Sequence, residues 1–281
     1  MDIEQARTFL VIAAHGSFLE AAHQLHLTQS TISARIKRLE EELKVSLFER
    51  SRNGADLTLA GSRFLSYARR LVVTADQALH DVPFAESTVG NIHIGARIAL
   101  CEGILPRWVG WMRDWESKIA IHCEIGFEED LIHRLIEGTL DVGLMYSPIQ
   151  GPGLVIEHLF NEKIVLVSTR QDDTGLANDY IYIHWGQDYY AQHKGLFPEF
   201  DRPSQVANIG WLGIQLILAN GGSCFLPKRL ADPLLANNRV HRVEGIEEIT
   251  QPTYVVYSRN SDNMILNDAI QGLRNQMAES H

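Results

Sequence analysis

Short polar side chains stand together near the amino end of the chain, where they could read the base edges of duplex DNA. Gln29 can bond N6 and N7 of an adenine in a bidentate manner, a contact worth about 1 to 3 kcal/mol of discrimination. The hydroxyl groups of Ser30 and Ser33 are less selective. This order of side chains indicates a surface that recognises bases.

Cations follow these polar side chains on the same segment. Lys37 and Arg38 can pair with phosphates, which adds affinity without choosing a sequence. The alternative for both cations is a solvated helix face, on which they pair with the acidic residues 40–42. We favour contact with DNA because the polar side chains flank the cations. The predicted DNA-contacting residues are Gln29, Ser30, Thr31, Ser33, Arg35, Lys37, Arg38, Arg50 and Arg52.

The spacing of apolar residues predicts the helices that must position these side chains. A first helix is expected over residues 3–14, and Ser17 with Glu20 reads as a capping box for a second. Thr28 can cap a third helix that runs to about Leu43. Its predicted buried face is made of Ile32, Ile36, Leu39 and Leu43. Three short helices, the third with an exposed polar face, are typical of a helix-turn-helix.

A hairpin is predicted directly after these helices. Two short strands, over residues 46–50 and 56–59, surround the dipeptide Asn53-Gly54, which is a strong hairpin signal. A hairpin that carries Arg50 and Arg52 is a wing suited to phosphate or minor-groove contact.

Thr58 can cap a long helix that continues to about Val82 and ends before Pro83. Its apolar positions repeat at heptad-like intervals, which favours pairing with a second copy of the chain. The alternative is an amphipathic helix packed on its own domain. The repeating positions are Phe64, Ala68, Leu71, Ala75, Ala78 and Val82.

Beyond a linker at residues 85–89, strands alternate with helices, a pattern typical of α/β folds. Strands are predicted over residues 90–95, 119–125, 141–145, 163–168, 180–184, 224–226 and 254–257. Helices are predicted over residues 103–115, 130–137, 211–220, 228–236 and 264–277. Two α/β lobes with a cleft between them are the expected architecture.

The net charge of −10 over 281 residues is unevenly divided. Residues 1–70 hold ten Lys or Arg and eight Asp or Glu, which is +2, and the remainder therefore carries −12. This asymmetry is expected when one module meets phosphates and the other does not. The three cysteines are scattered without a C-x-x-C pair, and the histidines lack metal-ligand spacing, so neither a metal nor another cofactor is expected. No long apolar stretch or signal peptide is seen, which predicts a cytoplasmic protein without a membrane partner.

The spaced residues of the first 60 positions form a continuous pattern: Gly16-Ser17-Phe18, Ala21-Ala22, Leu25, Leu27-Thr28-Gln29-Ser30, Ile32-Ser33, Ile36, Leu39-Glu40, Leu43, Leu47-Phe48, Arg50, Leu57-Thr58 and Ala60-Gly61. Further landmarks are Gly90 to Gly95, Leu105-Pro106, residues 135–142, Gly221-Gly222 and Leu226-Pro227. The whole pattern resembles the LysR-type transcriptional regulators.

The resemblance implies a multidomain α+β and α/β fold. A winged helix-turn-helix would span residues 1–58, a linker and dimerisation helix 59–86, and a two-lobed effector domain of the periplasmic-binding-protein type 90–281. Lobe I would take about residues 90–161 and 265–281, and lobe II about 162–264. The chain departs from the family pattern at Ser30, where Pro is frequent, at Ala34, where a longer polar side chain is common, and at Lys44, where Gly is usual. A DNA target therefore cannot be copied from a relative.

The resemblance also places ligand contacts in the loop after the first strand of the effector domain. Arg97 in this loop suits a carboxylate or phosphate effector. The alternative is that Arg97 pairs with Glu102 or Glu128. The predicted effector-contacting residues are Arg97, Ile98, Cys101, Glu128, Trp185, Gly186 and Gly221, although the last can simply end a helix.

The sequence thus predicts a sequence-specific transcription regulator whose activity responds to a small molecule bound between two lobes. Its predicted partners are double-stranded DNA, a second copy of the chain in a homodimer or dimer of dimers through the linker helix, an effector for which Arg97 suggests an anion, and RNA polymerase. An α/β enzyme and a solute-binding protein are the rival classes. The sequence contains no nucleophile elbow, phosphate loop or dinucleotide fingerprint, and a solute-binding protein should carry an export signal and no recognition helix.

Overall fold

The computed structural model describes residues 1–51, 54–81, 88–176, 178–200 and 202–278. The chain forms two compact units, Met1–Ser87 and Thr88–His281, which are called the N-terminal and the C-terminal unit. Each unit has its own buried apolar core.

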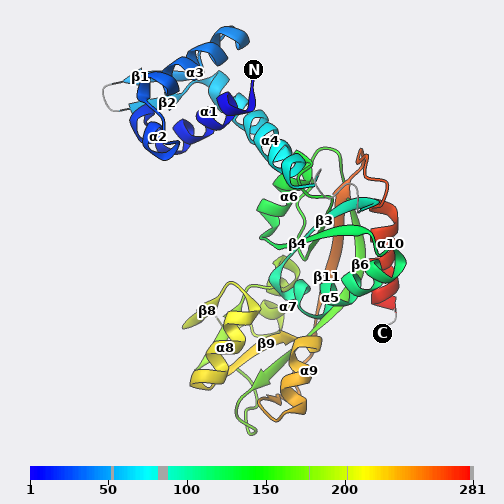
Figure 1. Ribbon diagram of the computed structural model, residues 1–281. Coiled ribbons are helices and arrows are strands. Elements are labelled where there is room, and N and C mark those ends of the chain that lie inside the picture. The colour runs from blue at the N-terminus through cyan, green and yellow to red at the C-terminus, as the bar shows by residue number, and fades with distance from the viewer. Residues whose placement is uncertain (52–53, 82–87, 177, 201, 279–281) are drawn as a thin grey trace. The chain divides into compact units, whose positions relative to one another are not determined.

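Three helices, a hairpin and one long helix build the N-terminal unit (Figure 1). They are α1 (Ile3–His15), α2 (Phe18–Gln24), α3 (Gln29–Leu43), β1 (Phe48–Ser51), β2 (Gly54–Leu57) and α4 (Leu59–Asp81). Phe9 lies at the centre of the core, with its ring centroid 5.1 Å from that of Phe48 and 5.0 Å from that of Phe64. One aromatic cluster therefore ties α1 to the hairpin and to α4.

The helices of this unit start where the sequence indicates. Ser17 Oγ accepts a hydrogen bond from the backbone N–H of Glu20, and Thr28 Oγ1 accepts one from Thr31. The capping box predicted at Ser17 is only half formed, because among the described residues the Glu20 side chain makes no return bond to the Ser17 N–H. A reciprocal capping box is present at α1, where Asp2 and Gln5 bond each other's backbone N–H groups, a feature that our sequence analysis missed. Thr58 Oγ1 accepts from the N–H of Gly61 and so caps the start of α4.

The C-terminal unit is built on one mixed sheet with the strand order β4-β3-β5-β11-β6-β9-β7-β8, and β10 pairs with β6. The strands are β3 (Gly90–Ala96), β4 (Ile119–Ile125), β5 (Val142–Met145), β6 (Leu154–Ser168), β7 (Tyr180–Ile183), β8 (Gln205–Ala207), β9 (Ser223–Pro227), β10 (His241–Arg242) and β11 (Ile249–Ser258). The helices are α5 (Ile98–Trp115), α6 (Glu128–Glu137), α7 (Gln187–Leu196), α8 (Gly210–Asn220), α9 (Lys228–Ala236) and α10 (Leu266–Ala278).

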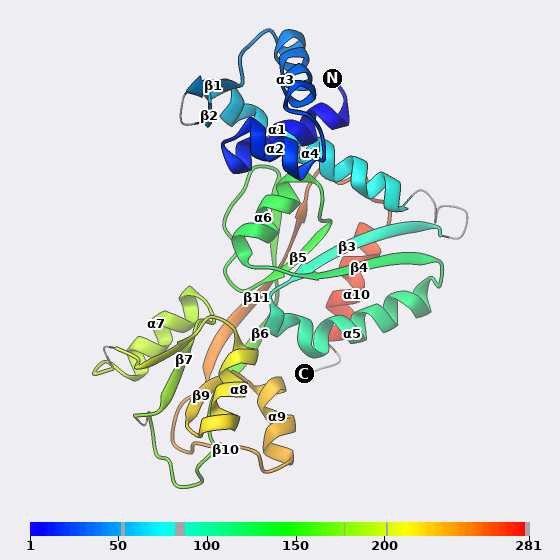
Figure 2. The ribbon, with the colours of Figure 1, turned by 60° about the vertical axis from the view of Figure 1, so that its left-hand side comes forward.

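Two lobes share this sheet, as Figure 2 shows. Strands β3, β4 and β5 are mutually parallel in one lobe, and β7, β8 and β9 are parallel in the other. The long strands β6 and β11 run antiparallel to each other and connect the lobes. The predicted fold class, a winged helix-turn-helix followed by a two-lobed α/β domain, is confirmed.

The observed elements of the C-terminal unit differ from the predicted ones in several places. The short strands β8 and β10 were not predicted, and β11 begins at Ile249 instead of residue 254. Strand β6 begins at Leu154 instead of residue 163, α7 was not predicted, and α5 begins at Ile98 instead of residue 103. Helix α5 is also interrupted, because Glu102 and Gly103 leave the helical conformation. Within the described part of the chain, no helix has the length and apolar character needed to cross a membrane.

Candidate nucleic-acid interface and effector cleft

Helix α3 separates an apolar face from a polar one. Ile32, Ile36 and Leu39 are fully buried in the core of the N-terminal unit, whereas Gln29 and Ser30 are exposed. The hydroxyl oxygens of Ser30 and Thr31 lie 2.9 and 2.8 Å from Thr28 Oγ1, so both take part in the capping of the helix. The structure thus presents the predicted base-reading side chains at the first turn of α3, with Ser33 half-buried beside them.

The predicted cations of α3 differ in their surroundings. Lys37 lies 3.8 Å from Glu41 and Arg38 lies 3.5 Å from Glu42, and both cationic side chains are more than 70% exposed, at 76% and 73%. Such exposed pairs contribute only about 0 to 1 kcal/mol, so both side chains can leave their partners for a phosphate. Arg35 instead contacts α1, where its Nη1 donates to Glu4 and Thr8 at 3.1 and 3.2 Å.

The hairpin that follows α3 packs on the turn between α1 and α2. Ala55 N donates to Gly16 O at 2.7 Å, and a Cβ at Gly54 would lie 2.5 Å from the same oxygen. Gly54 also has a φ of 142°, which side chains rarely allow, so glycine is required here. Arg50 pairs with Ala55 in the β1–β2 ladder, while its side chain and the whole of Arg52 lie outside the described residues.

The repeating apolar positions predicted on the long helix α4 fall into two groups. Phe64 and Ala68 are buried in the core of their own unit, as the alternative interpretation expected. Leu71, Ala75 and Ala78 instead line an open, largely apolar groove of about 1240 Å³. The other residues that line it are Met1, Ile3, Leu43, Val45, Leu47, Leu59, Ala60, Arg63, Phe64, Tyr67, Arg70 and Thr74. Val82 lies outside the described residues.

A cavity of about 720 Å³ lies in the C-terminal unit, between the ends of strands and the starts of helices from both lobes. Of the predicted effector-contacting residues it is lined by Arg97, Glu128 and Gly186. Gln187, which follows Gly186 and is a candidate from sequence for the same wall, also lines it. Sequence reasoning missed the remaining lining residues, which are Phe127, Glu129, Asp130, Ser147, Ile149, Tyr182, His184, Tyr190 and Asn208. We call this cavity the cleft.

The guanidinium group of Arg97 is already occupied by groups of the protein. Its Nη1 lies 2.9 Å from Glu128 Oε2, and its Nη2 donates to the carbonyl oxygen of His184 at 3.2 Å. Its central carbon lies 5.2 Å from the ring centroid of Phe127. The pairing of Arg97 with Glu128, which the sequence left open, is therefore the one observed.

Four helices begin at or beside residues that line the cleft: α5, α6, α7 and α8. None of them has a side-chain hydrogen bond from its own N-cap residue. Helix starts favour negative charge, because their first N–H groups point out of the helix. Glu129 and Asp130 lie in the first turn of α6. The negative side chains that offset the positive helix starts in the cleft therefore come from the wall formed by α6.

Four predicted residues lie outside the lining of the cleft. Trp185 is 1% exposed; it donates from Nε1 to Phe225 O at 2.9 Å, and its ring fills the space that a Cβ at Gly210 would need. Ile98 and Cys101 lie in the first turn of α5, and burial raises the pKa of the Cys101 thiol to about 11. Gly221 follows the last residue of α8 and closes that helix.

Residues close to Trp185 in the sequence line the cleft, although Trp185 itself does not. Gly186 has a φ of 131°, and a Cβ there would lie 2.7 Å from Ser147 Oγ. Tyr182 of β7 and Tyr190 of α7, on either side of Gly186 in the sequence, both line the cleft. Burial raises the pKa of Tyr182 to about 12, so its hydroxyl stays protonated. No cluster of His, Cys, Asp or Glu suited to a metal ion is found among the residues that the structure describes.

An exposed polar recognition helix with a hairpin beside it, joined to a two-lobed unit with a cleft, defines a ligand-responsive DNA-binding regulator. Comparison with known proteins agrees. Residues 3–62 match the family described as "Bacterial regulatory helix-turn-helix protein, lysR family", and residues 85–278 match "LysR substrate binding domain". The chain belongs to the LysR family and is a DNA-binding transcriptional regulator with an effector-binding domain.

Named relatives and solved structures extend over nearly the whole chain. The HTH-type transcriptional regulator HdfR of Yersinia pestis (strain Pestoides F) is 30% identical over 284 residues, which cover 95% of this chain and 94% of HdfR. The crystal structure of full-length CbnR with its target DNA has a TM-score of 0.72 at 21% identity and covers 98% and 99% of the two chains. LysG of Corynebacterium glutamicum, solved with bound effector Arg, has a TM-score of 0.57 at 19% identity and covers 99% of each chain.

Proposed function

We propose that the first turns of α3 enter the major groove of duplex DNA, with the β1–β2 hairpin as a wing beside them. The observation that carries this proposal is the division of α3 into a fully buried apolar face and an exposed polar one. Gln29 is the base-reading residue, assisted by Ser30 and Ser33, while Lys37 and Arg38 pair with phosphates. Arg50 and Arg52 of the wing add phosphate contacts. Arg35 has a different role, because it holds α3 to α1.

We also propose that the apolar groove along α4 receives a second copy of the chain. The groove is continuous with exposed apolar side chains of the same helix, Leu59 at 72%, Tyr67 at 61% and Leu79 at 75% exposed. A large exposed apolar patch is unfavourable unless a partner covers it. Pairing through α4, as a dimer or a dimer of dimers, would present two copies of α3 to two half-sites of an operator.

The cleft is proposed to bind the small-molecule effector, between lobes made of residues 90–161 with 265–281 and residues 162–264. Arg97 is neutralised by Glu128, so an anionic group of the effector would be held mainly by the helix starts. Gly186 and Gln187 at the start of α7 and Asn208 beside that of α8 line this wall. The arginine bound to LysG supports an effector of similar size.

We infer that the protein regulates by binding and has no catalytic role, because its named relatives are transcriptional regulators. RNA polymerase would then be the partner through which bound protein changes transcription, and the bacterial cytoplasm would be the place of action.

The test begins with duplexes selected from a random library for binding to the full chain. Gln29→Ala should reduce the preference for selected over scrambled duplexes about tenfold, because a bidentate base contact is lost. Lys37→Ala should weaken binding to both duplexes alike and lower the slope of affinity against salt by about one. If the protein shows no salt-sensitive affinity for any duplex, or if both variants behave alike, the proposed function is wrong.

A further inference from the structure

The first turn of α5 carries Arg97 to the cleft, and the helix breaks directly after it. Glu102 has a ψ of 118° and Gly103 a φ of 78°, so neither residue is helical. Pro106 lacks the N–H group that would bond the Glu102 carbonyl in a continuous helix. Residues 97–102, which we call the cleft turn, therefore need hydrogen-bond donors from elsewhere.

Arg229, the second residue of α9, supplies these donors. Its Nη1 donates to the carbonyl oxygen of Glu102 and its Nη2 to that of Ala99, contacts that join residues 127 and 130 positions apart in the chain. Its Nε pairs with Glu162 of β6. One planar guanidinium thus fixes two carbonyl groups and one carboxylate at once, a geometry that the ammonium group of lysine cannot reproduce.

The partners of Arg229 are themselves held in the interior. The side chain of Glu162 is 3% exposed and accepts a second hydrogen bond from the hydroxyl of Tyr146, which is fully buried. Tyr146 follows β5, whereas Glu162 lies on β6, one of the two strands that connect the lobes. A buried charge that is paired and hydrogen-bonded in this way resists displacement, because removing one partner leaves the other uncompensated.

The cleft turn is consequently held at both ends. Arg97 ties its start to Glu128 of α6 and to the His184 carbonyl, and Arg229 ties its end to α9 and β6. We propose that Arg229 is a positioning residue of the cleft: it fixes the cleft turn, so that α9 and the Arg97 wall move together. This inference rests on the proposed function of the cleft as the effector site.

The thiol of Cys101 in the cleft turn reports on this positioning without any effector. The background carries Cys123→Ser, because Cys123 is exposed and would react first. Iodoacetamide labelling of the full chain, followed by peptide mass spectrometry, gives separate rates for Cys101 and for the fully buried Cys224. Arg229→Met should raise the Cys101 rate about tenfold or more, because the turn then opens locally, while Cys224 stays protected.

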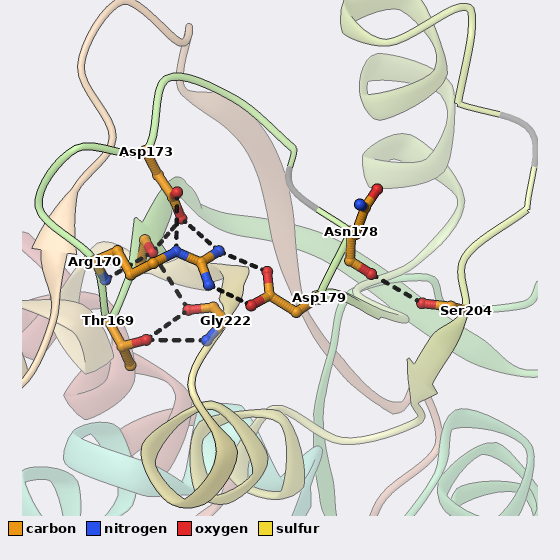
Figure 3. Close-up of polar contacts among 8 residues, drawn as sticks. Thr169, Arg170, Asp173, Asn178, Asp179, Ser204 and Gly222 are labelled. Carbon is orange, nitrogen blue, oxygen red and sulfur yellow. Dashed lines mark hydrogen bonds and ion pairs between the residues drawn. The ribbon is translucent and has the colours of Figure 1, made fainter.

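Two variants keep the test decisive. Arg229→Lys retains the charge beside Glu162 but cannot hold both carbonyl groups, so its Cys101 rate should lie between those of the parent and Arg229→Met. Arg170→Met is the matched control: Arg170 is bonded to Asp173 and Asp179 on a loop of the same unit, as Figure 3 shows. It should leave the Cys101 rate unchanged.

Two outcomes overturn the proposal. One is a Cys101 labelling rate that is the same with Met, Lys or Arg at position 229. If Arg229→Met yields no folded protein, a parent-like Cys101 rate in Arg229→Lys is enough to overturn the proposal. The other is a parallel rise of the Cys101 and Cys224 rates, which means that Arg229 only stabilises the unit as a whole. The labelling rates are measured without effector or DNA, so they test the positioning role of Arg229 alone. A failure to bind DNA would overturn the proposed role of α3, and a failure to bind any effector would overturn that of the cleft, and neither would change these rates, so the failures are distinguishable.

Discussion

Helix starts in the two units are satisfied in different ways. In the N-terminal unit, Asp2, Ser17, Thr28 and Thr58 each cap a helix that begins within three residues of them. At the cleft, the first N–H groups of α7 are bonded instead by Ser147 and Gln251, which lie 40 and 62 residues away in the sequence. The recognition helix is thus fixed by its own segment, whereas the cleft is held together by contacts between distant segments.

This difference has a functional consequence. A helix start that is capped within its own segment does not depend on side chains from distant segments, which suits a helix proposed to fit a groove of fixed shape. Helix starts that depend on distant side chains change when those segments move relative to one another. Such starts suit a cleft that has to respond to a ligand.

Gln251→Leu should produce the largest effect among the variants that test this comparison. Gln251 is fully buried, and its Oε1 accepts from Tyr189 N at 2.9 Å. Leucine would leave that N–H unsatisfied, at a cost of about 1 to 3 kcal/mol in the free energy of unfolding. Chemical denaturation of the full chain, followed by the near-ultraviolet signal of the C-terminal unit, measures the loss.

The matched control is Gln187→Leu in the first turn of the same helix. The Gln187 side chain is exposed, so its loss should change the free energy of unfolding by less than about 0.5 kcal/mol. Equal effects of the two substitutions would contradict the view that a distant side chain holds the start of α7.

Thr28→Ala tests the locally capped side of the comparison. Thr28 Oγ1 accepts from Thr31 N at 3.2 Å and contacts the Ser30 hydroxyl, so its removal should cost about 1 kcal/mol of stability in the N-terminal unit. Affinity for selected duplexes should fall as well, because the first turn of α3 carries Gln29. Thr28→Ser keeps the cap and should restore both properties; a variant that stays unstable with serine would show that the methyl group matters more than the cap.

The same contrast explains what the sequence could predict. The elements of the N-terminal unit could be predicted from short stretches of sequence. Ser17 and Thr28 indicate helix starts, the dipeptide Asn53-Gly54 indicates a hairpin, and the spacing of Ile32, Ile36 and Leu39 indicates a helix with one buried face. Helix α7 was missed because its N-cap is Gly186, which forms no side-chain cap. The capping groups come from Ser147 in the segment after β5 and from Gln251 on β11, and no local pattern reveals them.

Strand β6 was predicted too short for a related reason. The part that the prediction left out, residues 154–162, contains charged residues such as Glu157 and Glu162, which interrupt the apolar pattern of a buried strand. In the fold these carboxylates are paired with Arg274 and Arg229 from distant helices. For the cleft, Arg97 could be predicted because the resemblance places ligand contacts in the loop after the first strand of the effector domain, and Glu128 as a possible partner of Arg97. Tyr190 and Asn208 line the cleft from distant parts of the sequence that the fold brings together.

The smallest predicted effect concerns the exposed pair of Lys37 and Glu41 on α3. The two groups are 3.8 Å apart and their side chains are 76% and 65% exposed, so Glu41→Gln should change stability by no more than about 0.5 kcal/mol. Affinity for DNA should rise slightly, because Lys37 loses a competitor and one negative charge leaves the face that is proposed to meet phosphates. Chemical denaturation measures the stability, and DNA titration at several salt concentrations measures the affinity. A clear fall in affinity would mean that Glu41 orients Lys37 toward the phosphate, and the ion pair would then belong to the recognition surface rather than to a solvated helix face.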